Sequence, residues 1–138
     1  QCYGARANTG FLIGSEYESV MHPDGTLRVE PTMQVAGHST VYAVGDLTDV
    51  RESKRADAAR QQARVVIANI TAQIEGEAPD AHYVPTKEWV ILPLGPNMGA
   101  SQLLDSDGQT RILGAEQTAE IKGTDLMVSV IRSQLNLP

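Results

Sequence analysis

The sequence has little cysteine, few aromatic residues and no long apolar run. Its one cysteine, Cys2, has no disulfide partner within the chain, and no Cys/His cluster has zinc-ligand spacing. We therefore expect a reduced compartment, the cytoplasm, and no metal site. One Trp and one Phe among 138 residues predict a core built mainly from Ala, Val, Ile and Leu. No apolar run approaches the roughly 18 residues of a membrane-spanning helix, and we expect neither such a helix nor a signal peptide.

Positive charge is also scarce. There are 11 Lys and Arg residues against 17 Asp and Glu residues, which gives a formal net charge of −6 and argues against nucleic acid as a partner. A chain of this length has room for roughly one domain with a buried core. It starts with Gln1 rather than Met, and the residues that follow already read as structured sequence. We therefore expect it to be part of a longer protein.

The rest of the chain is organised around residues 40–46, which read Thr-Val-Tyr-Ala-Val-Gly-Asp. This pattern predicts a short buried strand that stops at Gly45 and presents the Asp46 carboxylate at its end. A helix follows after a polar loop. Open α/β sheets bind ligands where strand ends meet helix N-termini, so we expect a ligand here. The alternative reading of Gly-Asp is a plain turn at a strand end.

A long helix is predicted from Ser53 to about Glu75. Ser53 is a plausible N-cap and Gly76 a good terminator. Apolar residues recur at helical spacing and predict one buried stripe; they are Ala56, Ala59, Ala63, Val66, Ile67, Ile70 and Ile74. Charged residues are expected mostly to face outward, and these are Lys54, Arg55, Asp57, Arg60 and Arg64.

The remaining segments predict short β-structure and one more helix. Polar and apolar residues alternate at 26–29 and 33–35, which predicts half-buried strands before the strand at 41–44. A polar link with two prolines covers 77–85. Beyond it we expect strands over 88–94, 100–104 and 111–113, separated by glycine-containing turns. A last helix carries an apolar stripe over 126–135, for which core packing is favoured over a subunit interface and over a membrane-surface helix.

The order of these segments resembles a known family. Residues 40–46 resemble the second flavin-binding motif of the pyridine nucleotide–disulfide oxidoreductase superfamily, whose members have two dinucleotide-binding domains. Residues 4–9, Gly-Ala-Arg-Ala-Asn-Thr, resemble the family segment G-x-R-P-N-T, with Ala7 in place of the usual proline. Residues 25–29 and 33–35 stand where the family has a small β-hairpin.

The resemblance implies a fold, a cofactor and a set of binding residues. The fold class is α/β, with a partial FAD-binding Rossmann-like domain over 1–82 and a small α+β C-terminal domain over 83–138. In the family the aspartate hydrogen-bonds the ribityl chain of FAD and the helix N-terminus faces the pyrimidine end of the flavin. This implies FAD-binding roles for Gly45, Asp46, Lys54 and Arg55, and no catalytic residue. No G-x-G-x-x-G motif occurs, so we expect the rest of the FAD site and the NAD(P)H site in a missing N-terminal part.

Two further segments narrow the resemblance. Residues 45–70 and the segment 94–102 are similar to the apoptosis-inducing-factor-like and ferroptosis-suppressor group, related to type II NADH dehydrogenases. Members of these groups pass electrons from NAD(P)H through FAD to quinones. Residues 59–62 resemble the A-x-Q-Q segment on the quinone side of the dehydrogenases, although Asp57 replaces a usual glutamine. The intact parent is thus expected to be an FAD-dependent NAD(P)H oxidoreductase acting on a quinone or similar acceptor.

Several alternatives stay open. The chain could be a non-catalytic interaction or dimerisation module that binds no flavin by itself. Lys54 could stabilise reduced flavin or be an ordinary exposed cation in the first helical turn. Gln61 and Gln62 are expected to face solvent, and His22, His38 and His82 to lie at the surface. A homodimer and peripheral membrane contact are also open.

Overall fold

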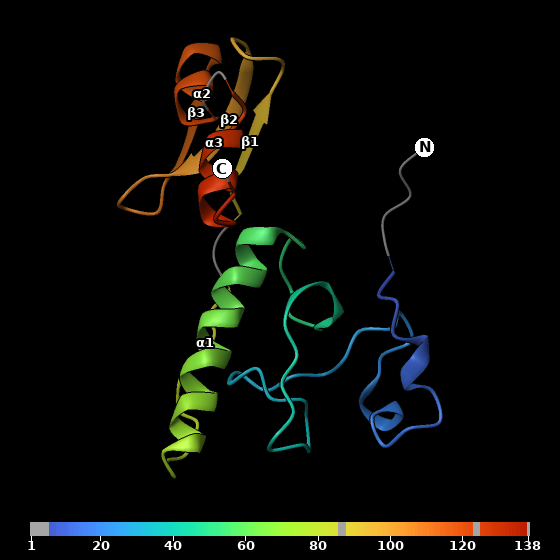
Figure 1. The fold of residues 1–138 in the computed structure, drawn as a ribbon. Coiled ribbons are helices and arrows are strands. Elements are labelled where there is room, and N and C mark those ends of the chain that lie inside the picture. Colours follow the sequence, from blue (N-terminus) through green and yellow to red (C-terminus); the bar gives the residue numbers. More distant parts are fainter. Residues whose placement is uncertain (1–5, 86–87, 123–124, 138) are drawn as a thin grey trace. The chain divides into compact units, whose positions relative to one another are not determined.

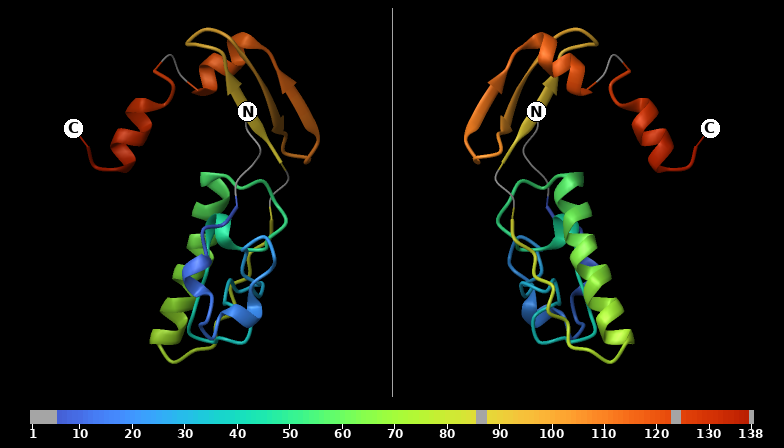
Figure 2. Two further views of the ribbon diagram at one scale, coloured as in Figure 1. Left: turned by 90° about the vertical axis from the view of Figure 1, so that its right-hand side faces the viewer. Right: turned by 90° about the vertical axis from the view of Figure 1, so that its left-hand side faces the viewer.

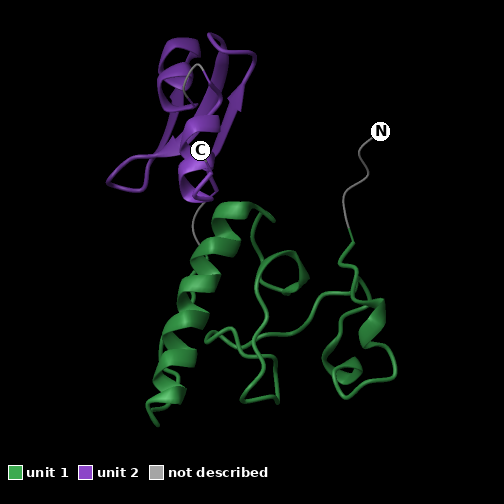
Figure 3. Ribbon diagram, viewed as in Figure 1, with its two compact units in different colours: residues 1–86 green, residues 87–138 purple. Residues whose placement is uncertain are grey.

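The computed structural model describes residues 6–85, 88–122 and 125–137. The chain divides into two compact units, residues 1–86 and 87–138 (Figure 3). Cys2 and the Gly4-Ala5 part of the G-x-R-P-N-T resemblance lie outside the described residues. Helices and a small antiparallel sheet both occur (Figure 1), so the predicted mixed α/β class is confirmed.

The principal element of the first unit is helix α1, Ala56–Ile74. It begins three residues after the predicted N-cap, because Arg55 occupies the N-cap position and no side chain caps the helix there. The predicted end is confirmed. Glu75 is the C-cap and Gly76 follows with φ +82°, which lets the chain leave the helix through the left-handed region.

The buried face of α1 differs from the predicted apolar stripe. The buried side chains are Ala58, Gln62 and Asn69, whereas Ile67 and Ile74 are 63% and 80% exposed. In both views of Figure 2, α1 runs along one side of the first unit and the irregular segments lie on the other. The polar side chains are buried because they bond to backbone groups of those segments, which an apolar stripe could not do.

The irregular segments form short 3-10 helices and isolated bridges. The described 3-10 helices are Gly10–Leu12, Glu18–Val20 and Gly45–Leu47. The predicted strands at 26–29, 33–35 and 41–44 appear only as single bridges, among them Val29 with Val35 and Gln34 with Tyr42. A small apolar core joins them, and its buried members are Val20, Leu27, Val35, Ala36 and Ala43.

Asn69 ties the segment after α1 back onto the first unit. Its Nδ2 donates to the Thr32 and Ala81 carbonyls at 3.0 and 2.8 Å, and its Oδ1 accepts the Ala81 N–H at 2.9 Å. Tyr83 then donates its N–H to the Pro31 carbonyl at 2.8 Å. Tyr83, which opens the predicted C-terminal domain, is therefore bonded to residues of the first unit.

The second unit is a three-stranded antiparallel sheet with two short helices. Strands β1 (Val90–Pro93), β2 (Gly99–Leu104) and β3 (Thr110–Leu113) pair in the order β1-β2-β3, in agreement with the predicted strands. Helix α2, Ala115–Lys122, packs against β1 and β2 and was not predicted. Its buried residue is Thr118, whose hydroxyl bonds to that of Ser101 at 2.8 Å.

The predicted last helix is α3, Val128–Gln134, which is shorter than the dozen residues expected. No residue of α3 is buried, and Leu126, Val130, Ile131 and Leu135 are between 39% and 63% exposed. Core packing of this stripe is therefore wrong for the part of the chain that the structure describes. Among the described helices, none is long and apolar enough to cross a membrane.

Candidate functional site

The candidate site is the turn at Gly45 and Asp46, where the extended segment 40–44 reaches α1. Val44 is extended at φ −139° and ψ 155°, and Gly45 reverses the chain at φ +81°. A Cβ placed on Gly45 would meet only the Ala59 Cβ, at an ordinary 3.7 Å. Glycine is therefore required here by its backbone conformation and not by a lack of space.

Both backbone polar groups of Gly45 are bonded within the protein. Its carbonyl accepts the N–H and the hydroxyl of Thr48, at 3.1 and 2.9 Å. Its N–H donates to Oε1 of Gln62 at 2.6 Å. The turn is thus held from two sides, by a fully buried threonine and by a side chain of α1. The backbone of Gly45 has no polar group left for a ligand.

The Asp46 carboxylate remains exposed at this fixed turn. The turn lies against the N-terminal part of α1, where Gly45 approaches Ala59. A helix N-terminus carries partial positive charge and favours electron-rich oxygen atoms. Together the two features suit a ligand that donates hydroxyl groups to a carboxylate and places a carbonyl near the helix.

Gln62 is the site residue that sequence reasoning placed wrongly. It was predicted to face solvent, yet only 2% of it is exposed. Beyond its bond to Gly45, its Nε2 donates to Oε1 of Glu52 at 2.7 Å. Glu52 also accepts the hydroxyl of Tyr83 at 2.7 Å. Burial and the neighbouring Glu52 carboxylate raise the pKa of Tyr83 to about 12, so its proton stays in this bond.

A signal for this polar face does exist in the sequence. Ala58, Gln62, Asn69 and Gln73 recur at spacings of four and seven, and these spacings place them on one side of a helix. The competing stripe of Ile and Val residues is more hydrophobic, so a hydrophobicity pattern selects it instead. The face with Ala58 and the amide side chains is the buried one, because its small and amide side chains can approach and bond to the backbone of the facing segments.

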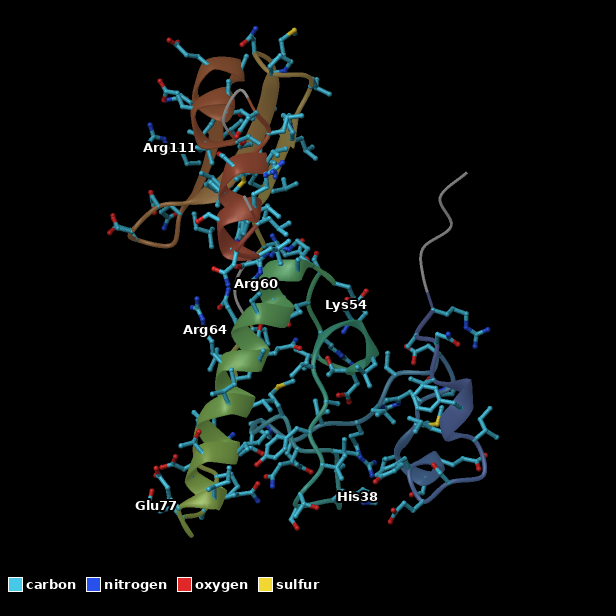
Figure 4. The ribbon with its side chains drawn as sticks, viewed as in Figure 1. His38, Lys54, Arg60, Arg64, Glu77 and Arg111 are labelled. Carbon is cyan, nitrogen blue, oxygen red and sulfur yellow. The ribbon has the colours of Figure 1, made fainter. Side chains whose placement is uncertain are left out.

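Lys54 lies in the loop that enters α1 (Figure 4), and Arg55 is the N-cap residue, so neither is in the first turn of the helix. The Lys54 ammonium donates to the carbonyls of Thr48 and Val50, at 2.6 and 3.1 Å, and holds the loop closed. Arg55 is half-buried. Arg60 and Arg64 project from α1 away from the rest of the first unit, as predicted for the charged residues (Figure 4).

An open cleft runs along the same loop. It has a volume of about 500 Å³ between the turn 22–26 and the loop 48–54. His22 lies in it and contacts Asp49 at 3.2 Å, while the other oxygen of Asp49 accepts the Val29 N–H at 3.1 Å. The space bounded by Gly45, Asp46 and the start of α1 has no room even for a water molecule. A ring-sized ligand must therefore contact Asp46 from outside.

The histidines are placed at or near the surface. His22 and His82 are exposed, while His38 is half-buried against the Tyr17 ring at a centroid distance of 4.8 Å. Within the described ranges, no group of three or more His, Cys, Asp and Glu residues is arranged to hold a metal ion.

The sequence is similar to several known proteins. No protein-family profile matches the chain. The chain is 28% identical to FAD-dependent oxidoreductase FVFD30 of Flammulina velutipes over 130 residues, which is 94% of this chain and 40% of that protein. It is 36% identical to human ferroptosis suppressor protein 1 over 102 residues, 74% of this chain and 27% of that protein.

A third relative comes from a slime mould. Apoptosis-inducing factor homolog B of Dictyostelium discoideum is 33% identical over 126 residues, 90% of this chain and 32% of that protein. The chain thus spans between 27% and 40% of the length of these three curated relatives. The similarity covers both units of the chain in the longest of the three matches.

Proposed function

The chain belongs to the apoptosis-inducing-factor-like and ferroptosis-suppressor group of FAD-dependent oxidoreductases, and from this we propose that it supplies the ribityl-binding part of an FAD site. The observation that carries the proposal is the exposed Asp46 carboxylate, next to a Gly45 whose N–H and carbonyl are both bonded within the protein. An aspartate in that position can accept hydrogen bonds from sugar-like hydroxyls without any rearrangement of the turn.

The residues of this site fit the ribityl and pyrimidine end of FAD. Asp46 offers carboxylate oxygens to hydroxyl donors, and the N-terminal turn of α1 has no capping side chain of its own. The partial positive charge of a helix N-terminus favours the carbonyl oxygens of a flavin ring. Gly45 shapes the turn and does not itself donate, because Gln62 takes its N–H. Lys54 and Arg55 add positive charge beside the helix start, with Lys54 fixed by its bonds to loop carbonyls.

We propose the remaining activity for the longer protein to which these residues contribute. FAD, when bound, would supply the hydride- and electron-transfer chemistry between NAD(P)H and an acceptor. The pyrophosphate and nicotinamide sites are then made by residues outside this sequence, which is consistent with a chain that spans only 27–40% of its relatives. The proposed acceptor is a quinone or a similar small molecule, and the proposed location is the cytoplasm.

The competing function is a non-catalytic interaction or dimerisation module. One observation favours it: Val90, Leu92 and Ile112 share one face of the sheet in the second unit and are 40%, 56% and 69% exposed. Apolar groups gathered on one face are common at interfaces. A homodimer and peripheral membrane contact through α3 belong to this proposal and are compatible with a flavoenzyme as well.

Replacement of Asp46 tests the proposed function. In the full-length protein we expect Asp46→Ala to weaken FAD binding by about tenfold or more, since a charged hydrogen-bond acceptor is lost. Flavin retained per chain and the dissociation constant of FAD, from quenching of flavin fluorescence, are the measurements. Asp80→Ala, which removes an exposed carboxylate after α1, is the matched control and should leave both unchanged. Equal FAD affinity in Asp46→Ala and wild-type protein would show that Asp46 is not a flavin ligand.

A further inference from the structure

Three hydrogen bonds in series connect the Gly45 turn to the segment after α1. The Gly45 N–H donates to Oε1 of Gln62 at 2.6 Å, Nε2 of Gln62 donates to Glu52 at 2.7 Å, and the Tyr83 hydroxyl donates to the second Glu52 oxygen at 2.7 Å. We refer to Gly45, Gln62, Glu52 and Tyr83 as the turn relay.

The direction of every bond in the turn relay is fixed by chemistry. A backbone N–H can only donate, so the Gln62 carbonyl oxygen must face Gly45. Its amide nitrogen then faces Glu52, which as a carboxylate can only accept. Tyr83 completes the series as a donor, and its raised pKa of about 12 keeps it protonated. Rotation of the Gln62 amide by half a turn would break two bonds at once.

Water cannot easily replace a lost member. Gln62 is 2% exposed and Tyr83 is 8% exposed, so both lie inside the first unit. If Gln62 no longer accepts, the Gly45 N–H loses its protein partner in a partly buried setting, which is unfavourable. The φ of Gly45 is then less restrained, and a change in that angle shifts the Asp46 backbone that follows it.

We propose that Gln62 is a positioning residue for the flavin-binding carboxylate of Asp46, and that Glu52 and Tyr83 hold Gln62 in the orientation this requires. The inference rests on the proposed function, because it concerns the same FAD site. Gln62 does not contact FAD under this proposal. It acts through the Gly45 N–H, while Thr48 holds the carbonyl of the same residue.

A second glutamine on α1 provides an internal control. Gln73 accepts the Tyr42 hydroxyl at 2.9 Å and donates to the Ser39 carbonyl at 2.9 Å. It therefore makes two hydrogen bonds to residues 39–42, as many as Gln62 makes in the turn relay. Neither bond involves Gly45: Ser39 precedes the extended segment, and Tyr42 lies before Val44. Loss of Gln73 should lower stability without moving the Gly45 turn.

The experiment compares FAD affinity and thermal stability of the two variants in the full-length protein. We expect Gln62→Leu to raise the FAD dissociation constant about tenfold, as befits one lost positioning bond. Gln73→Leu is expected to lower the melting temperature about as much as Gln62→Leu does, while its FAD affinity stays at the wild-type value. If Gln62 contributes only to stability and does not position Asp46, FAD affinity should instead fall together with the melting temperature in both variants.

An exchange of two residues tests the order of donors and acceptors. Gln62→Glu alone places two carboxylates side by side and should impair FAD binding. Combined with Glu52→Gln, it restores an acceptor facing Gly45, a donor between the two side chains and an acceptor facing Tyr83. We expect FAD affinity in this double variant to return to within about threefold of wild type, with the single variants about tenfold weaker.

The outcomes separate this inference from the proposed function. Wild-type protein that binds no FAD overturns both. Wild-type protein that binds FAD with an affinity unchanged by Gln62→Leu overturns the positioning role alone. So does failure of the exchanged double variant to bind better than Gln62→Glu. If Gln62→Leu does not fold, two other variants still test the positioning role of Gln62 separately from the proposed function. They are the double variant and Tyr83→Phe, which removes one hydroxyl.

Discussion

At the scale of single residues, Gly45 and Asp46 divide the work of the candidate site. Gly45 adopts a positive φ and gives both of its polar groups to internal bonds, while Asp46 keeps its carboxylate exposed. The motif in the sequence was enough to predict the turn at Gly45 and the carboxylate beside it, whereas the strand predicted before it is reduced to a single bridge at Tyr42. It could not predict Gln62, because the partner of a backbone N–H depends on how helix and turn pack and not on local pattern.

Substitution of Gly45 by alanine tests the reason for the glycine. The new Cβ meets no clash, so we expect a loss of about 1 kcal/mol in the free energy of unfolding from the positive φ alone. Gly10→Ala, also without a nearby atom and without a positive φ, is the control and should cost almost nothing. Chemical denaturation measures both. An equal effect of the two substitutions would contradict the conformational argument.

The Tyr83 hydroxyl predicts a dependence of stability on pH. Its pKa rises from 10.0 to about 12 in the folded protein because of burial and the Glu52 carboxylate. The bond to Glu52 therefore contributes fully below pH about 10 and is lost as pH rises toward about 12. We expect the wild-type protein to lose about 2 kcal/mol more stability than Tyr83→Phe over that interval. Identical pH profiles would show that Tyr83 ionises as freely as in solution.

At the scale of elements, α1 was predicted in kind and length but not in orientation. Its end at Gly76 followed from local chemistry, whereas its start moved from Ser53 to Ala56. The buried side is polar because Asn69, Gln62 and Gln73 each bond to irregular backbone. Such bonds depend on the segments facing the helix, which periodicity cannot describe. The same holds for α2, whose buried residue is a threonine and which has no apolar stripe to detect.

Asn69 is the strongest test of that polar helix face. Asn69→Leu leaves the Thr32 carbonyl and both backbone groups of Ala81 without their partner. We expect a loss of about 2–4 kcal/mol in stability, because one buried and two partly buried backbone groups lose their partner. Arg64→Leu, at an exposed position on the opposite side of α1, should change stability by less than about 0.5 kcal/mol. Comparable losses in thermal unfolding would mean that the apolar stripe, and not Asn69, faces the unit.

In the second unit, the Ser101–Thr118 pair predicts a non-additive result. Both side chains are buried and each is the other's partner. Thr118→Val or Ser101→Ala alone should cost about 1–3 kcal/mol, since one hydroxyl is left unsatisfied. The double variant removes both hydroxyls and should be less destabilised than the sum of the two. A double-mutant cycle in urea measures the coupling, and strict additivity would contradict it.

At the scale of the whole molecule, the sequence predicted a mixed α/β chain and the family to which it is related, and both are confirmed. The strands predicted at 26–29, 33–35 and 41–44 are reduced to single bridges within the described residues. A strand needs a neighbour to form a ladder, and the chain covers at most 40% of the relatives compared. Within the described residues these segments bond instead to neighbouring loop backbone, as in the Val35 N–H to Val41 carbonyl and Ala43 N–H to Met33 carbonyl bonds.

The most direct test is a titration of the full-length protein, stripped of flavin, with FAD. The account predicts saturable binding of one FAD per chain, followed by bleaching of the bound flavin when NAD(P)H is added without oxygen. Full-length protein that remains colourless and does not quench FAD fluorescence at any concentration would contradict the claim that Asp46 belongs to a flavin site.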